Sequence, residues 1–256
     1  MAETATFKLP NGIEVFHLNA GETSFLYEEI FTRHAYCRHG ITLHPGACVF
    51  DVGANIGIAS LFFLEAARDI KVYAFEPIPD LFRLLRANLL SYGGRGKAFN
   101  VGLSQKSGSA KFTFYQNNSI MSGQYADLAE DGAVGAAFMS NVGMSAESAE
   151  FLARKQLQQK TVLCRLKRLS EIIASEHVER IDLLKVDVEK GEGDVFAGID
   201  AADWSRIHQV VVEVHDRDGR LDAMRQLLHE HGFACSVEQD ETLRSTCIHS
   251  IFARRP

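Results

Sequence analysis

The sequence predicts an α/β fold with a seven-stranded, mostly parallel sheet and helices on both faces. Two observations support this prediction. Over residues 48–101 and again over 169–253, short apolar strands alternate with helical segments, a pattern typical of parallel sheets. The chain has 256 residues, 46% of them hydrophobic, which is enough for one large core. We therefore expect one domain over residues 46–256, with an N-terminal extension (1–45) and an insertion (116–160).

The N-terminal extension is expected to contain a hairpin and a helix. Residues 6–18 alternate in polarity around an Asn-Gly pair, which is typical of a tight hairpin turn. Thr23 or Ser24 can cap a helix that we expect to end near Gly40. This helical segment is a candidate lid over a ligand.

The first half of the core follows in regular order. A proline opens its second helix and a Gly-Gly pair ends it, as the preferences of helix termini predict. The expected strands are Cys48–Val52, Lys71–Phe75 and Lys97–Val101, and the expected helices are Ile56–Ala67 and 79–93.

The regular order then breaks at the insertion. Ser109–Tyr115 and Thr161–Leu166 are strand-like and are expected to pair antiparallel at a sheet edge. A helix is expected over 145–159, capped by Ser145. Such a long insertion is typically a lid, a binding segment or surface decoration. The second half is expected to contain strands at Ile181–Val188, Ile207–Val214, Phe233–Glu238 and Thr246–Ala253, the last two antiparallel, and helices at Leu169–Glu176, Gly191–Ala197 and Leu221–His231.

Composition excludes several classes of partner. The net charge of −6 and the isoelectric point near 5.9 argue against nucleic-acid binding. Five cysteines without a CxxC pair predict free thiols and no zinc site. No signal peptide or long apolar run is recognisable. We therefore expect a cytoplasmic protein with no membrane partner.

The most informative segment is the turn after the first core strand, Asp-Val-Gly-Ala-Asn-Ile-Gly at 51–57. Ligands of open α/β sheets bind beyond the carboxyl ends of the strands. Gly53 and Gly57 would let a ligand approach the backbone. Glu76 ends the next strand, where an acid can bind both hydroxyls of a ribose.

Details of this turn favour S-adenosylmethionine over a dinucleotide. The Gly-x-Gly-x-x-Gly turn that holds a pyrophosphate is missing. Asp51 would repel a pyrophosphate but suits a ligand with an ammonium and a sulfonium. The third strand ends in Asn100-Val101-Gly102, which can frame an adenine. The predicted cofactor residues are Asp51, Gly53, Asn55, Gly57, Glu76, Pro77, Asn100, Val101, Gly102 and Tyr27.

Four segments resemble the FkbM-type family of S-adenosylmethionine-dependent O-methyltransferases. They are 49–57, Ala-Phe-Glu-Pro at 74–77, Asn-Val-Gly-Leu-Ser at 100–104 and Ile-Asp-Leu-Leu-Lys-Val-Asp-Val-Glu-Lys-Gly-Glu at 181–192. Lys190 departs from the family pattern, which more often has Gly or Ser at this point. The resemblance implies a class I methyltransferase fold, with S-adenosylhomocysteine as the product.

Segments outside the core, such as 11–15 and 23–31, resemble family members within polyketide and nonribosomal peptide synthases. This resemblance implies an acceptor bound through phosphopantetheine to an acyl or peptidyl carrier protein, with neighbouring synthase domains as partners. A free small metabolite or a sugar remains an alternative acceptor. A cofactor-binding module without activity, and a nicotinamide dehydrogenase, are the rival classes.

Methyl transfer to an alcohol needs a base, and His215 is the predicted one. It directly follows a valine-rich strand at the carboxyl edge of the sheet. Asp187, Glu189 and Glu213 lie at the same edge, and Glu189 is expected to orient His215 or contact the acceptor. These three acids could instead bind a divalent ion, although we expect no metal. Tyr36, Met121 and Ser122 are the candidate acceptor-binding residues.

Overall fold

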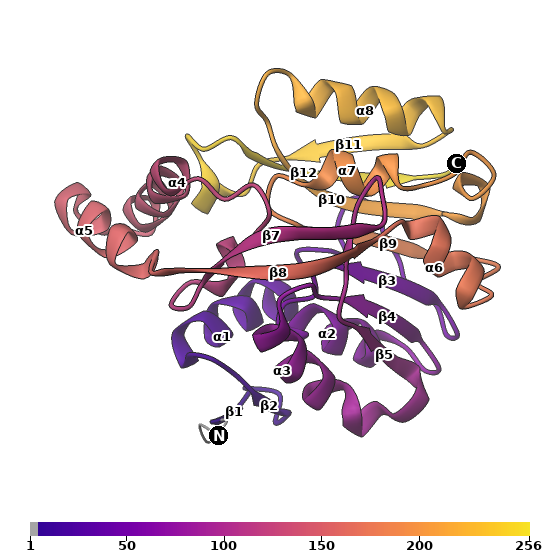
Figure 1. Cartoon of the computed structure of the whole chain (residues 1–256), viewed down its shortest axis with the longest axis horizontal. Helices are drawn as coiled ribbons and strands as arrows, with labels where there is room; N and C mark the ends of the chain where they lie inside the picture. Colours follow the sequence, from indigo (N-terminus) through magenta and orange to yellow (C-terminus); the bar gives the residue numbers. More distant parts are fainter. Residues whose placement is uncertain (1–4) are drawn as a thin grey trace.

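The computed structural model describes residues 5–256. Its main sheet has seven strands in the order β11-β12-β10-β9-β3-β4-β5 (Figure 1). Strand β12 runs antiparallel to both of its neighbours, and all other pairings are parallel. The predicted sheet is thereby confirmed. The strands are β3 (Cys48–Val52), β4 (Lys71–Phe75), β5 (Gly96–Phe99), β9 (Leu183–Val186), β10 (Gln209–His215), β11 (Ala234–Glu238) and β12 (Ile248–Arg254).

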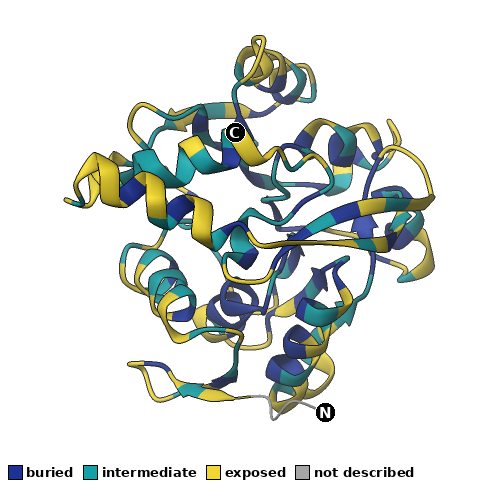
Figure 2. Cartoon of the chain, turned by 60° about the vertical axis from the view of Figure 1, so that its left-hand side comes forward, coloured by how far each residue is buried: buried dark blue, intermediate teal, exposed yellow. Residues whose placement is uncertain are grey.

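Helices cover both faces of this sheet because its strands are apolar on both sides. Val49 packs into the core beneath α2 and α3, whereas Phe50 packs into the core beneath α6, α7 and α8. Figure 2 shows these central strands in the dark blue of buried residues. The helices are α2 (Ile58–Ala66), α3 (Pro79–Leu89), α6 (Leu169–Ser175), α7 (Glu192–Ala197) and α8 (Arg220–Glu230), with short turns η2 (Leu90–Arg95), η3 (Ser119–Met121), η4 (Trp204–Arg206) and η5 (Glu241–Leu243).

The extension contains the predicted hairpin, β1 (Thr6–Lys8) and β2 (Glu14–Phe16). Its helix α1 (Ala20–Tyr27) begins earlier than predicted, because the Asn19 side chain accepts the backbone N–H of Glu22 at 2.7 Å and acts as the cap. A π-helical turn, η1 (Glu28–Thr32), ends the helix well before Gly40. Residues 1–4 of the predicted extension lie outside the described part.

The predicted antiparallel pair exists as β7 (Gly108–Tyr115) and β8 (Gln159–Lys167). The prediction that this pair extends the edge of the main sheet was wrong. The pair forms a separate three-stranded sheet with β6 (Gly102–Leu103). This small sheet crosses in front of the main sheet in Figure 1. The reason is burial, since Phe112 and Cys164 on its inner face join the core beneath α2 and α3.

The insertion contains α4 (Leu128–Asn141) and α5 (Ala146–Gln156). Helix α5 and its Ser145 cap were predicted, but α4 was not, since glycines weaken its pattern. One of them, Gly135, lies where a Cβ would be 3.4 Å from the Cβ of Ala153, so small residues let the two helices pack closely. Figure 2 shows α5 largely exposed. Among residues 5–256, no helix is long and apolar enough to cross a membrane.

Candidate active site

A first cavity lies beyond the carboxyl ends of β3 and β4. Gly53 and Asn55 form its floor in left-handed conformations, with φ of 77° and 50°. A Cβ on Gly53 would lie 1.7 Å from the carbonyl oxygen of Asp187, so only glycine fits there. This close approach brings the β3 turn against the end of β9.

Glu76 lies at the rim of the first cavity and is only 4% exposed. Its Oε2 accepts the backbone N–H of Asn55 at 3.0 Å, and its Oε1 accepts that of Ile78 at 2.8 Å. Burial raises the pKa of Glu76 to about 8 although both N–H donors favour the charged form. Each oxygen keeps a lone pair for a further donor, so this carboxylate fits a ribose diol.

Asp51 does not line either cavity. It is fully buried, accepts the Ser60 hydroxyl at 2.6 Å and lies 3.1 Å from Lys185 Nζ. Lys185 Nζ also donates to the carbonyl oxygen of Gly53 at 2.8 Å. Burial lowers and Asp51 raises the pKa of Lys185, with a net rise, so the lysine stays charged. The predicted contact of Asp51 with the cofactor is therefore replaced by a role in holding the β3 turn.

Three other predicted cofactor residues also do not line the first cavity. Gly57 begins α2, and a Cβ there would lie 2.8 Å from Leu85 Cδ1. Tyr27 stacks on Phe31 with ring centroids 4.9 Å apart. Val101 is buried in the core. These residues support the walls of the first cavity but do not line it.

The third strand end contributes only in part. Gly102 and Pro77 line the first cavity, as predicted. Asn100 does not, since its Nδ2 donates to the carbonyl oxygens of Glu76 and Pro77, both at 3.0 Å. Asn100 thus fixes the backbone that presents Glu76. The adjacent wall is apolar and can cover an adenine face; it consists of Phe75, Leu81, Leu103 and Phe112.

A second cavity of about 340 Å³ lies beside the first, a volume typical of small-molecule sites. Helix α1 and helix α4 both contribute apolar lining, Phe25 from the former and Val134 and Phe138 from the latter, and the rings of Phe25 and Phe138 meet edge-on with centroids 5.2 Å apart. Met121 lines this cavity, as predicted for acceptor binding. Ser122 instead lines the first cavity, and its Oγ accepts the backbone N–H of Tyr115 at 3.0 Å.

The two cavities meet at five shared lining residues, Leu26, Tyr36, Ile120, Asp187 and Glu189. The hydroxyl of Tyr36 donates to Asp187 Oδ2 at 3.0 Å. Burial and the charge of Asp187 raise the pKa of Tyr36 well above its ordinary value, so the phenol stays a donor. Polar groups from the N-terminal extension and from β9 therefore converge where one ligand would face the other.

Two more acids line the second cavity near this junction, Glu29 and Glu213. Burial, with the charge of Asp187, raises the pKa of Glu29 to about 7. Burial and the neighbouring acids Asp187 and Glu189 raise the pKa of Glu213 well above its ordinary value. At neutral pH the cluster therefore retains protons, which reduces the repulsion between its members.

His215 is 2% exposed and lines neither cavity. Its Nδ1 lies 3.0 Å from Glu192 Oε1 and its Nε2 lies 3.2 Å from Glu189 Oε2. Burial lowers the pKa of His215, but the two carboxylates outweigh burial and raise it to about 12. A histidine that is already charged cannot accept a proton, so the arrangement does not support the predicted base. Glu189, which His215 contacts through Nε2, is the better candidate for the base.

Within residues 5–256, Glu189, Glu213 and His215 form a group that could hold a metal ion. Their ligand atoms lie within 4.8 Å of one another. Both ring nitrogens of His215 already have carboxylate partners, so binding a metal would break one of these contacts. The expectation that no metal is needed stays a prediction.

Several site residues were not predicted. Lys185 could have been noticed, because a lysine inside the apolar run Leu-Leu-Lys-Val is buried only with a partner. Glu192, the second partner of His215, had no comparable signal. Glu29 comes from a helix whose place above the sheet cannot be read from sequence spacing.

Comparison with known proteins places the chain among methyltransferases. The model of the methyltransferase FkbM domain matches residues 51–235. The 31-O-demethyl-FK506 methyltransferase FkbM of Streptomyces tacrolimicus is 44% identical over 98% of this chain and 96% of its own length. The AMB antimetabolite synthetase AmbE of Pseudomonas aeruginosa is 40% identical over 97% of this chain, but this match is 12% of the synthetase. The methyltransferase sdnD of Sordaria araneosa is 31% identical over 94% of each chain.

Proposed function

Because the chain belongs to the FkbM methyltransferase family, we propose that it moves a methyl group from S-adenosylmethionine to a hydroxyl or enol oxygen. The observation that carries this proposal is the junction of the two cavities at Tyr36, Asp187 and Glu189. The first cavity would hold the cofactor, with Glu76 on the ribose and the apolar wall on the adenine. The second cavity would hold the acceptor.

The cofactor supplies an electrophilic methyl group on a sulfonium, and the protein supplies alignment and a base. Glu189 lies at the junction and would take the proton of the acceptor hydroxyl as the oxygen–carbon bond forms and the sulfur–carbon bond breaks. Burial raises the pKa of Glu189, against the charge of His215, which makes it a stronger base than an ordinary carboxylate. His215 would orient Glu189 and balance its charge.

We propose further that the acceptor is bound to a carrier protein. The match to a segment of the AmbE synthetase supports this, since that segment is only 12% of a much longer synthetase. The alternative is a free small molecule, which the full-length match to a 31-O-demethyl-FK506 methyltransferase favours. The two readings differ in whether the protein recognises more than the acceptor group.

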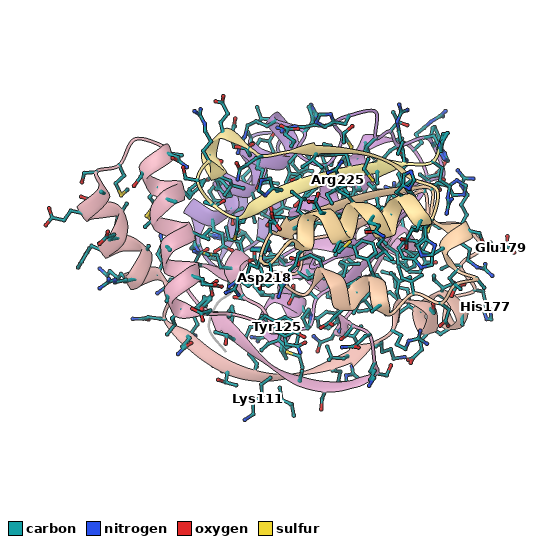
Figure 3. All side chains as sticks on the ribbon, turned by 90° about the horizontal axis from the view of Figure 1, so that it is seen from above. Lys111, Tyr125, His177, Glu179, Asp218 and Arg225 are labelled. Carbon is teal, nitrogen blue, oxygen red and sulfur yellow. The ribbon has the colours of Figure 1, made fainter. Side chains whose placement is uncertain are left out.

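The small sheet offers a surface suited to an acidic carrier. Strands β7 and β8 carry four cationic side chains and no acidic one, in a chain of net charge −6. Lys160 pairs with an acid on α3, but within the described residues Lys111, Arg165 and Lys167 form no ion pair. Lys111 extends away from the body of the molecule in Figure 3. Leu163, opposite Lys111, is 69% exposed.

One experiment separates these acceptors. The protein is incubated with S-adenosylmethionine and either β-hydroxyacyl and β-ketoacyl carrier proteins or the same acyl groups as free thioesters, and a gain of one methyl is followed by mass spectrometry. We expect the carrier-bound forms to be preferred. Charge reversal at Lys111 and Arg165 should weaken only the carrier reaction, while reversal at Arg68 and Arg86, exposed elsewhere, should not. Equal rates for both forms would favour the free acceptor, and binding of cofactor with no methylation of any acceptor would favour a module without activity.

A further inference from the structure

Two consecutive residues at the junction have a strained backbone. Glu189 and Lys190 follow β9 and adopt φ of 53° and 73°, although neither is a glycine. Left-handed conformations are unfavourable for such side chains and persist only where surrounding contacts hold them. Glu189 is also the residue to which the proposed function assigns the acceptor proton, so the contacts that hold this turn bear on the chemistry.

The strongest of these contacts comes from the inserted helix α4. Lys190 Nζ lies 2.5 Å from Asp131 Oδ1 and 3.2 Å from Glu130 Oε2, both in the first turn of α4. The side chains of Lys190 and Asp131 are only 4% and 2% exposed. Burial lowers the pKa of Lys190, but Asp131 and Glu130 outweigh it and the pKa is raised, so the lysine is charged.

Asp131 is itself fully engaged. Its Oδ2 accepts the hydroxyl of Tyr115 at 2.8 Å and the backbone N–H of Asp127 at 2.9 Å. Tyr115 belongs to β7 and is completely buried. The ion pair of Lys190 thus links the turn after β9 to a buried, hydrogen-bonded carboxylate between the insertion and the small sheet.

Glu192 and His215 connect the two residues of this turn to each other. The backbone N–H of Lys190 donates to Glu192 Oε1 at 2.8 Å. Glu192 holds Nδ1 of His215, whose Nε2 contacts Glu189. Gly123 presses on the same turn, since a Cβ there would lie 2.9 Å from the Cβ of Glu189. The orientation of Glu189 therefore depends on the contacts of the turn with α4 and on its contacts with Glu192 and His215.

Helix α4 also forms a wall of the acceptor cavity through Val134, Gly135, Phe138 and Met139. We infer that Lys190 and Asp131 are positioning residues, through which the inserted helix α4 holds Glu189 at the junction of the two cavities. The insertion then has two tasks, shaping the acceptor site and fixing the base. This inference rests on the proposed role of Glu189 in methyl transfer.

A double-mutant cycle tests it in the full-length protein. Lys190→Met and Asp131→Asn should each lower kcat about tenfold or more, since small displacements of a reacting group are costly, while the Kd of S-adenosylhomocysteine stays within about twofold. Because Lys190 acts through Glu189, the pair Glu189→Gln with Lys190→Met should lose no more activity than Glu189→Gln alone. Lys97→Met removes a partly exposed ion pair with Glu176 and serves as the matched control.

The outcomes distinguish the two proposals. If Glu189→Gln keeps full activity, the proposed base is wrong. If Glu189→Gln is impaired but Lys190→Met and Asp131→Asn are not, or if the losses multiply in the double variant, the positioning role is wrong. Tyr115→Phe removes only one hydrogen bond to Asp131, so it keeps the test available where the other variants unfold; a smaller loss in kcat is expected, and Lys190→Arg should restore part of the activity.

Discussion

His215 touches neither cavity, whereas Glu189 lines both. Position in the sequence could not separate the two, because His215 ends β10 and Glu189 follows β9, and these parallel strands end at the same edge. What separates them is the number of partners. His215 has a carboxylate on each nitrogen and a pKa of about 12, so it is a charged support. Glu189 has a single charged partner, His215, lines both cavities and has a raised pKa, as the proposed base requires.

Glu76 leads to a prediction on cofactor binding. Its pKa in the free protein is about 8, so it is protonated at pH 6.5 and charged at pH 9. Two ribose hydroxyls favour the charged form, and binding should therefore tighten as pH rises through about 8 and level off above it. Below pH 8 the affinity for the cofactor should fall by at most about tenfold for each unit of pH.

Calorimetry with S-adenosylhomocysteine across this pH range measures the effect. The ligand's own amine titrates in the same range, so the wild-type curve is compared with that of Glu76→Gln, in which only the ligand contributes. Parallel curves would mean that Glu76 does not bind the cofactor in its charged form.

At the scale of elements, helix α4 was the least predictable part of the chain, yet it lines much of the second cavity, which we propose holds the acceptor. Its glycines suggest a loop, yet they are what lets it pack on α5. Helix α1 was predicted, but its predicted start was wrong, because Asn19 and not Thr23 or Ser24 acts as the N-cap. Local pattern identifies a helix, while the place of α1 over the sheet depends on distant contacts, such as the backbone N–H of Ser119 donating to Glu22 Oε2 at 2.8 Å.

A substitution on α4 tests its role as a wall. Val134→Trp places a large side chain in the second cavity, which Val134 lines, and leaves the first cavity unchanged. We expect the KM for the acceptor to rise at least about tenfold, with cofactor affinity within about twofold. Steady-state kinetics and calorimetry measure both. The same substitution at Val142, which is 56% exposed at the end of α4, is the control, and equal effects at the two positions would mean that the cavity is not the acceptor site.

At the scale of the whole molecule, the order of strands and helices follows from the sequence because each apolar run has a clear length and terminus. The predicted sheet was therefore confirmed, and Gly53 and Glu76 line the first cavity beyond its strand ends. That they bind the cofactor stays a prediction. Asp51 was expected to face the cofactor but lines neither cavity, because Lys185, its register partner on the neighbouring strand β9, lies 3.1 Å from its carboxylate and neutralises it. Partnerships between strands and the insertion are long-range, and single-sequence spacing contains no information about them.

Different parts of the chain build the two cavities. The main sheet and α2 build the first cavity, the extension and the insertion build the second, and the turn after β9 belongs to both. The two cavities are thus built largely by different segments of the chain.

The most direct test of this account is the single-turnover rate of methyl transfer by Glu189→Gln with a β-hydroxyacyl acceptor and saturating S-adenosylmethionine. We expect a loss of roughly 10²–10⁴-fold, the range for a general base, with the Kd of S-adenosylhomocysteine changed less than about twofold. His215→Gln should lose less than Glu189→Gln, since it acts by orienting Glu189. A Glu189→Gln variant that transfers methyl at the wild-type rate, or a His215→Gln variant that loses more, would contradict it.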